Sequence, residues 1–321
     1  MQLNLPILHL LQDKQNILIA GGGGGFDIFA GLPLYFTLRE MGKTVHLANY
    51  TFMDFRLARH LSQPVEDLDG LLMGLRGRVH IPTQYFPEGH LADWFTQRGE
   101  DVTVWMFDRV GVVPLAKAYQ HLIDKFNIEA IILVDGGVDS LMRGDEQAPG
   151  TLLEDSITLA ATQNLDVPVK IQACLGFGTE IEEGVCHHHA LENMAALIKA
   201  GAFYGVCALT PDMSAFQLYE SACRHAWEQT PDAHKSQIST RIIPAVKGDF
   251  GNFHMYPRDE HMPVFISALM SLYWFFDAVK VADASLLVPV LRETQTAEQA
   301  RNIGLRAYLD RKLRPVQRIP Y

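Results

Sequence analysis

The sequence predicts an α/β protein with a doubly wound, mostly parallel sheet and helices on both faces. Two observations carry this prediction: the candidate strands are almost wholly apolar, and helical segments separate them along most of the chain. Apolar strands of this kind are typical of parallel sheets that are covered on both faces. The chain has 321 residues, of which 48% are hydrophobic, and we expect them to form one α/β domain over residues 1–321.

Seven apolar runs give the predicted strands, which span 16–20, 44–50, 102–107, 129–135, 167–175, 203–209 and 240–246. The predicted helices span 33–41, 114–126, 151–164, 188–199, 211–227 and 296–313. Gly42 suits the end of the first helix, and Pro114 suits the start of the second. Thr151 and Glu154 form a capping box at the start of the third. The longest apolar run, 264–276, is interpreted as a buried helix or an oligomer contact.

Two regions depart from the alternation of strands and helices. Residues 51–100 are rich in Arg, Gly and Pro, and we expect an inserted cap over the sheet edge there. Residues 285–321 are expected to form a C-terminal helical extension of the same domain.

The overall charge limits the classes of partner. The net charge is −10 and the isoelectric point is about 5.7, without a basic run. Nucleic acids and anionic membrane surfaces are bound by clustered Lys and Arg, so neither is expected as a partner. The four cysteines are widely spaced, which is typical of free thiols in a reducing compartment. We therefore expect a cytoplasmic protein with a small-molecule ligand. The apolar run 264–276 is the segment that favours a homo-oligomer.

Five consecutive glycines follow the first strand, and Asp27 comes soon after them. In open parallel sheets, ligands bind beyond the carboxyl ends of the strands, which is where this run lies. Glycine lets another molecule approach the main chain, and exposed amides at the start of a helix bind anions, phosphate above all. The alternative is that the glycines form only a flexible connector. Ordering five glycines between a buried strand and a helix costs much conformational entropy, which favours a binding role over a simple connector.

Other strand ends combine glycines with acids in the same way. Polar and glycine residues follow the fourth strand over 135–146, the fifth over 176–180 and the seventh over 247–254. Because the carboxyl ends of parallel strands share one edge, we expect these groups to meet the glycine run in one crevice. Arg143 lies between two acid pairs, where it would bind phosphate or neutralise Asp139 and Asp145.

Known nucleotide motifs fit this pattern only in part. A G-x-G-x-x-G fingerprint starting at Gly21 would need glycine at Phe26, and the second strand ends without an acid for a ribose hydroxyl. The segment 135–140, DGGVDS, resembles the S-G-G-x-D-S pyrophosphate loop of ATP pyrophosphatases, but Asp135 replaces its first serine. The adjacent histidines at 187–189 cannot all face one ion on a helix, so an ordinary helix start is favoured there.

Three segments resemble signatures of a family of hypothetical proteins, largely archaeal and bacterial, that is classed as a domain of unknown function. These segments are AGGGGGFDIFAGLPLYFTLRE, VHLANYTF and VDGGVDSLMRGDE. The resemblance covers most of the chain and implies one coherent family domain. It implies no mechanism.

These features predict a small-molecule enzyme, a hydrolase or group transferase, with a phosphorylated or nucleotide-like substrate. The predicted binding residues are Gly21, Gly22, Gly23, Gly24, Gly25, Gly136, Gly137, Ser140, Gly176 and Gly178. The predicted Mg²⁺ ligands are Asp135, Asp139 and Asp145. The predicted catalytic residues are Asp27, Asp139, Glu180 and His254. A non-catalytic nucleotide or metabolite sensor and a Rossmann-type dinucleotide-dependent enzyme are the alternatives.

Overall fold

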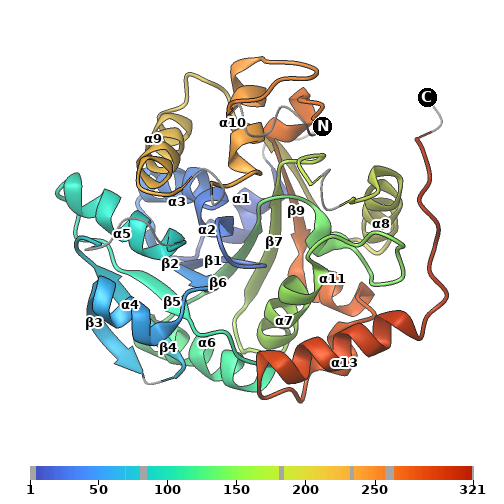
Figure 1. The fold of residues 1–321 in the computed structure, drawn as a ribbon, viewed down its shortest axis with the longest axis horizontal. Helices are drawn as coiled ribbons and strands as arrows, with labels where there is room; N and C mark the ends of the chain where they lie inside the picture. The colour runs from blue at the N-terminus through green and yellow to red at the C-terminus, as the bar shows by residue number, and fades with distance from the viewer. Residues whose placement is uncertain are drawn as a thin grey trace.

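The computed structural model describes residues 5–68, 70–79, 85–180, 184–231, 235–256 and 264–319. Within these ranges the chain forms a nine-stranded sheet in the order β3-β4-β5-β2-β1-β6-β7-β9-β8, shown in Figure 1. The strands are β1 (Asn16–Gly21), β2 (Thr44–Tyr50), β3 (Gln63–Leu68), β4 (Leu72–Arg76), β5 (Val104–Phe107), β6 (Ala130–Asp135), β7 (Val169–Leu175), β8 (Phe203–Ala208) and β9 (Leu272–Asp277). The predicted α/β class is confirmed, with a sheet that is mostly parallel.

The centre of the sheet is parallel. Strands β5, β2, β1, β6 and β7 pair in parallel, and the chain proceeds outward from β1 first in one direction and then in the other. The carboxyl ends of these strands are aligned, because Gly21 of β1 pairs with Asn49 of β2 and with Val134 of β6. The turns after β1 and β6 therefore meet at one edge of the sheet.

Helices pack on both faces of the sheet (Figure 1). Alternate side chains of β1 show the division, since Ile17 and Ile19 enter one core and Leu18 and Ala20 the other. The first core includes residues of α1 (Pro6–Leu11), α2 (Asp27–Ala30), α3 (Leu32–Glu40), α4 (Phe55–Leu61), α5 (Pro87–Gln97), α9 (Ser214–Glu228) and α10 (Ser239–Lys247). The second includes residues of α6 (Val112–Phe126), α7 (Leu152–Gln163), α8 (His187–Lys199), α11 (Ala278–Ala284), α12 (Val288–Leu291) and α13 (Ala297–Leu309).

Two predicted elements are wrong, and the errors are related. The run 240–246 is not a strand, because it lies inside α10 with Ile242 and Ile243 buried. The run 264–276 is not a buried α-helix, because its second half forms β9, which pairs antiparallel with both β7 and β8. The alternative for this run, an oligomer contact, stays a prediction. Short apolar runs do not distinguish a buried strand from a buried helix, although the Tyr, Trp and Phe residues of β9 favour a strand.

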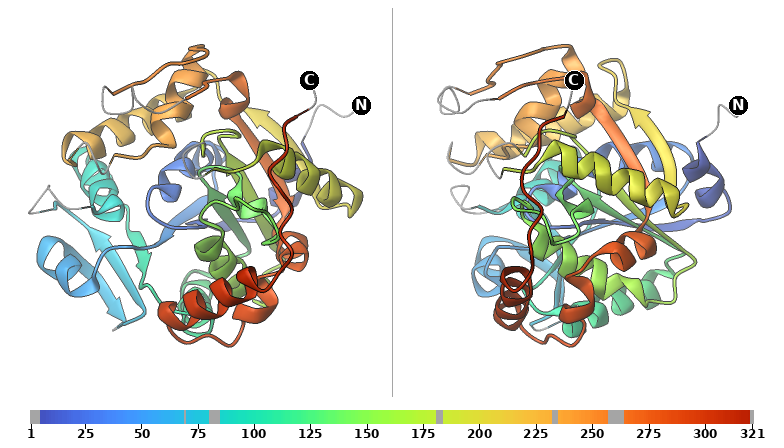
Figure 2. Two further views of the ribbon diagram at one scale, coloured as in Figure 1. Left: turned by 45° about the vertical axis from the view of Figure 1, so that its right-hand side comes forward. Right: turned by 90° about the vertical axis from the view of Figure 1, so that its right-hand side faces the viewer.

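The two regions that interrupt the predicted alternation pack against the same sheet. Residues 51–100 contribute α4, α5 and the hairpin of β3 and β4, and β4 extends the sheet beyond β5. Near the C-terminus, α12 and α13 pack on α7, and residues 310–319 then run past α8 (Figure 2). No helix in the described ranges combines the length and the apolar character that crossing a membrane requires.

Candidate functional site

A cavity of about 410 Å³ lies at the carboxyl edge of the parallel strands. Its walls come from the turn after β1, the turn after β6, the start of α7 and residues 235–239 at the start of α10, together with Phe52, Tyr85 and Glu180. The acidic residues among its walls are Asp27, Asp135, Asp139, Glu154 and Glu180. The structure therefore brings four of the predicted acids, Asp27, Asp135, Asp139 and Glu180, into one hollow. The predicted binding glycines Gly23, Gly24 and Gly136 also line it.

Asp27 connects the turn after β1 to the turn after β6. The other strands before β6 are added on one side of β1, and β6 and β7 are added on the other side. Its Oδ2 accepts a hydrogen bond from the amide of Gly23 at 2.8 Å, and its Oδ1 accepts one from the amide of Gly136 at 3.1 Å. The amide of Gly22 donates to the carbonyl of Val134 at 2.7 Å. The glycine run is thus held against the end of β6 by main-chain contacts, which a row of bare residues permits.

The five glycines have different roles. Gly23 and Gly24 line the cavity, whereas a Cβ on Gly21 would collide with the side chain of Asn49. The amides of Gly22 and Gly23 are already bonded within the protein. In the part of the chain that the structure describes, the amides of Gly24, Gly25 and Phe26 have no acceptor. These three amides, just before α2, are the ones that remain for an anion.

Glu180 and Asp139 form a second group of acids on the other side of Asp135. Glu180 accepts hydrogen bonds from the amides of Val138 at 2.7 Å and Asp139 at 3.1 Å. Asp139 Oδ2 accepts bonds from the amide of Thr151 at 2.6 Å and from its hydroxyl at 2.7 Å. The predicted capping box is therefore wrong, because the Thr151 hydroxyl binds Asp139 and does not cap α7.

Asp155 was not predicted as a site residue from the sequence, and it does not line the cavity but lies beside two acids that do, Asp27 and Asp135. It lies on α7, is 1% exposed, and neither carboxylate oxygen has a hydrogen-bond partner in the described ranges. Carboxylate oxygens of Asp27, Asp135 and Asp155 lie within 4.8 Å of one another, and so do those of Asp135, Asp139 and Glu180. The available signal was an acid on an otherwise apolar helix face, in the segment LLEDSITLAA.

Proximity and burial change the protonation of these acids. Burial, reinforced by the nearby charge of Asp139, raises the pKa of Asp135, Asp155 and Glu180 well above the ordinary range of carboxylic acids. Without a cation the group retains protons at pH values where exposed carboxylates are ionised. The arrangement is suited either to binding a cation, which displaces those protons, or to exchanging protons with a ligand.

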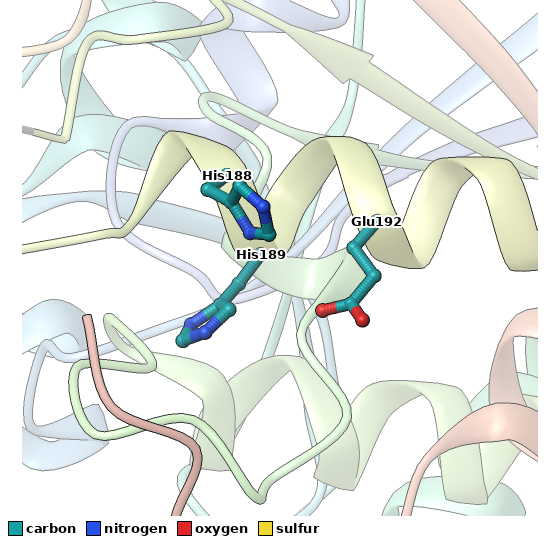
Figure 3. A group of neighbouring side chains, drawn as sticks. All are labelled: His188, His189 and Glu192. Atoms are coloured by element: carbon teal, nitrogen blue, oxygen red, sulfur yellow. The ribbon is translucent and has the colours of Figure 1, made fainter. Parts of the chain in front are cut away.

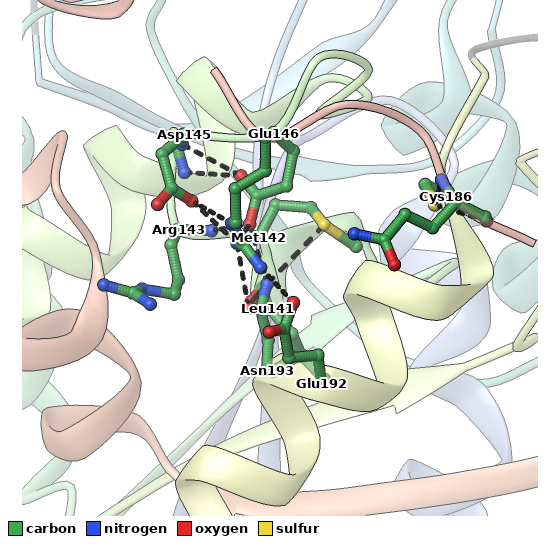
Figure 4. A network of polar contacts seen from close by, with 11 residues as sticks. Leu141, Met142, Arg143, Asp145, Glu146, Cys186, Glu192 and Asn193 are labelled. Carbon is green, nitrogen blue, oxygen red and sulfur yellow. Dashed lines mark hydrogen bonds and ion pairs between the residues drawn. The ribbon is translucent and has the colours of Figure 1, made fainter. Parts of the chain in front are cut away.

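Several predicted site residues lie outside the cavity. Ser140 is buried behind Asp135, to which its amide donates at 3.1 Å. Gly176 and Gly178 are buried and do not line the cavity, and the ring of His254 contacts the side chain of Asn252 at 3.0 Å. Asp145 binds Arg314 from the C-terminal segment at 2.7 Å, in the network of Figure 4. Neither Asp145 nor His254 joins the acid cluster.

Comparison with protein families gives one match. The model of a family described as Protein of unknown function (DUF1152) matches residues 92–310 of the chain. The chain belongs to this family. The matched DUF1152 region contains Asp135, Asp139, Asp155 and Glu180, whereas the glycine run and Asp27 precede it. Searches of curated proteins and of solved structures returned no match.

Replacing Gly137 by alanine is expected to destabilise this DUF1152 protein more than the same change at Gly42. Both residues have positive φ, of 150° and 80°, which costs alanine about 1–2 kcal/mol. A Cβ at 137 would also collide with the carboxyl group of Glu180, whereas a Cβ at 42 would meet no atom of the described residues within 4 Å. The collision is expected to add about 1–3 kcal/mol. Denaturant unfolding of G137A and G42A compares the two, and equal losses would contradict the placement of Glu180.

Glu88→Gln is expected to remove a pH dependence of stability. Glu88 is fully buried below the glycine run, where Asn49 Nδ2 donates to both its Oε1 and the carbonyl of Gly25. Burial raises the pKa of Glu88 from 4.5 to about 7. Above pH 4.5 the folded state then binds more protons than the unfolded state, so stability falls as the pH rises, by about 3 kcal/mol in total.

The measurement is the free energy of unfolding of wild type and E88Q at several pH values. The two proteins are expected to be similar near pH 4, and E88Q is expected to be the more stable at pH 8. A difference between them that does not change with pH would show that Glu88 keeps an ordinary pKa in the folded protein.

Proposed function

We propose that this protein is an enzyme that binds a divalent cation of the Mg²⁺ type and a phosphorylated or nucleotide-like small molecule in the cavity, and that it catalyses hydrolysis or group transfer. The observation that carries the proposal is the position of Asp155 beside Asp27 and Asp135, as a buried carboxylate that has no hydrogen-bond partner among the described residues. Buried polar atoms are rarely left without hydrogen bonds unless a water, ion or ligand completes them.

A cation explains why these carboxylates lie together. Three buried or half-buried acids within 4.8 Å repel one another when ionised, and a divalent ion replaces that repulsion with attraction. Carboxylate oxygens are the ligands that Mg²⁺ prefers, and Mg²⁺ usually keeps positions for water and for substrate phosphate. Asp27, Asp135 and Asp155 are the proposed ligands. Asp145, which binds Arg314, is not retained as a ligand.

The glycine run favours a phosphorylated ligand. The amides of Gly24, Gly25 and Phe26 remain for an anion beside acids that would otherwise repel it. The cation would lie between the phosphate of the ligand and the acids. Lys235, which also lines the cavity, adds positive charge. We further propose that the central strands form a doubly wound, Rossmann-like sheet, whose ligands bind where the direction of the chain reverses, here between β1 and β6.

Glu180 and Asp139 are the proposed proton carriers. They lie beside the proposed cation ligand Asp135, and the raised pKa of Glu180 lets it hold a proton at pH values where an exposed glutamate is ionised. A carboxylic acid of this kind can protonate a leaving group or accept a proton from an attacking water or hydroxyl.

The test is a thermal-shift panel of nucleotides and sugar phosphates, each with and without Mg²⁺, followed by assays of phosphate release and transfer. A true ligand at a hundred times its dissociation constant is expected to add about 2.7 kcal/mol of stability, and only when Mg²⁺ is present. Binding without turnover would favour a sensor, and stabilisation by NAD or NADP without Mg²⁺ would favour a dinucleotide-dependent enzyme. No response to any cation or phosphorylated compound would reject the proposal.

A further inference from the structure

A second group of metal-ligating side chains lies on α8, apart from the acid cluster. Figure 3 shows His188, His189 and Glu192 at the start of this helix. His189 is fully buried, and neither of its ring nitrogens has a hydrogen-bond partner within the described ranges. The Nδ1 of His188 is also buried without a partner there. Imidazole nitrogens in this state are rare in folded proteins, so they indicate a ligand that completes them.

The spacing of the three residues suits one ion. Successive helical residues are rotated by about 100°, so Glu192, four positions after His188, projects between the directions of His188 and His189. One ligand atom from each of the three lies within 4.8 Å of the others. The third adjacent histidine, His187, does not face the same ion, because it packs on Phe177 with ring centroids 5.3 Å apart. Two of the histidines and a glutamate one turn later can face one ion.

The side chains around Glu192 carry more negative than positive charge, and Arg314 is the cation that opposes a metal ion there. Arg314 binds Glu192 through one guanidinium nitrogen and binds Asp145 and Glu146 through another. Three carboxylates therefore surround one guanidinium, which leaves this region negative. Glu192 accepts the Arg314 bond on Oε2, its Oε1 has no partner among the described residues, and its side chain is 52% exposed. An ion from solvent can therefore reach Glu192.

We propose that His188, His189 and Glu192 bind a zinc-type transition-metal ion. Two imidazole nitrogens and one carboxylate are a ligand set that suits Zn²⁺ far better than Mg²⁺, and three protein ligands leave at least one position for water or another group. The site shares no residue with the acid cluster, so it does not depend on the function proposed there. Because Glu192 also binds Arg314, an ion at this site is linked to the contact that holds the C-terminal segment on α8.

The test is a titration of the full chain with Co²⁺ in the presence of excess Mg²⁺, which is added to occupy the acid cluster. Co²⁺ substitutes for Zn²⁺ and has a visible spectrum that reports nitrogen ligands. The variants are His188→Asn and Glu192→Gln, which change the two more exposed ligands and spare the buried His189. His187→Asn is the matched control, since it removes a neighbouring imidazole that points elsewhere.

Wild type and H187N are expected to bind Co²⁺ with the same spectrum, and Zn²⁺ is expected to displace it. H188N and E192Q are expected to bind at least about tenfold more weakly. Competition with Zn²⁺ gives the same ranking if the spectrum is weak. The proposal is overturned if wild type gives no spectrum of nitrogen-ligated Co²⁺, or if H188N and E192Q bind as wild type does.

Discussion

Asp155→Asn is expected to stabilise the metal-free protein and to abolish its stabilisation by Mg²⁺ or Mn²⁺. Asparagine has nearly the same shape but carries no charge, so it relieves the repulsion with Asp27 and Asp135. We expect a gain on the order of 1–3 kcal/mol without metal. The variant lacks a carboxylate of the proposed cation site, so the gain of about 2.7 kcal/mol that we expect wild type to show at a hundred times the dissociation constant of the cation should disappear. The measurement is denaturant unfolding of both proteins with and without cation.

The pH dependence of this effect has a definite sign. The pKa of Asp155 is raised in the folded state, so above its ordinary value of 3.8 the folded protein binds more protons than the unfolded chain. Its contribution to stability therefore declines as the pH rises, and the advantage of D155N without metal should grow from acid to neutral pH. Asp13→Asn is the matched control, because it makes the same exchange at an exposed aspartate outside the cavity walls and both carboxylate groups, and it should change neither stability nor the response to cation. A D155N protein that still responds to cation would exclude Asp155 as a ligand.

Arg314→Met is expected to destabilise the protein by about 3 kcal/mol or more, because it leaves a buried carboxylate without its cation. The side chain of Glu146 has no exposed surface, and Arg314 binds it at 2.6 Å. Figure 4 shows this network, in which Glu146 also accepts hydrogen bonds from main-chain amides and from Asn193. Those bonds orient the carboxylate but do not neutralise it.

Two further variants make this prediction specific. Arg306→Met removes an arginine whose side chain is 86% exposed and 3.8 Å from its partner, and it should cost less than about 0.5 kcal/mol. Adding Glu146→Gln to R314M removes the unpaired charge and should restore part of the lost stability. Denaturant unfolding of the three variants measures these differences. If R306M and R314M lose the same stability, Arg314 does not neutralise a buried charge.

The local part of the candidate site could be predicted from the sequence. Glycines and acids directly after apolar strands had to lie at one edge once the strands were parallel, and Asp27, Asp135, Asp139 and Glu180 do line one cavity there. The parallel centre of the sheet was also predictable, since its strands are continuous apolar runs separated by helices.

The remaining errors concern contacts between residues that are distant in the sequence. Asp145 was predicted as a metal ligand, and Arg143 was its predicted partner, but its carboxylate binds Arg314, 169 residues away. Asp155 was missed because the direction in which a helical residue projects depends on how the helix packs. The run 240–246 and β9 were misassigned for the same reason, because tertiary packing decides which apolar run enters the sheet.

The position of β9 has a consequence for how the chain reaches its native state. β8 ends at Ala208. Its partner β9, which also pairs with β7, begins only at Leu272. A nascent chain that has emerged only as far as α10 therefore exposes an open edge on β7 and an unpaired β8. Such edges promote intermolecular association, and pairings of long sequence separation form slowly. We expect the last step of folding to be the closure of this gap, and the incomplete chain to need protection from aggregation until then.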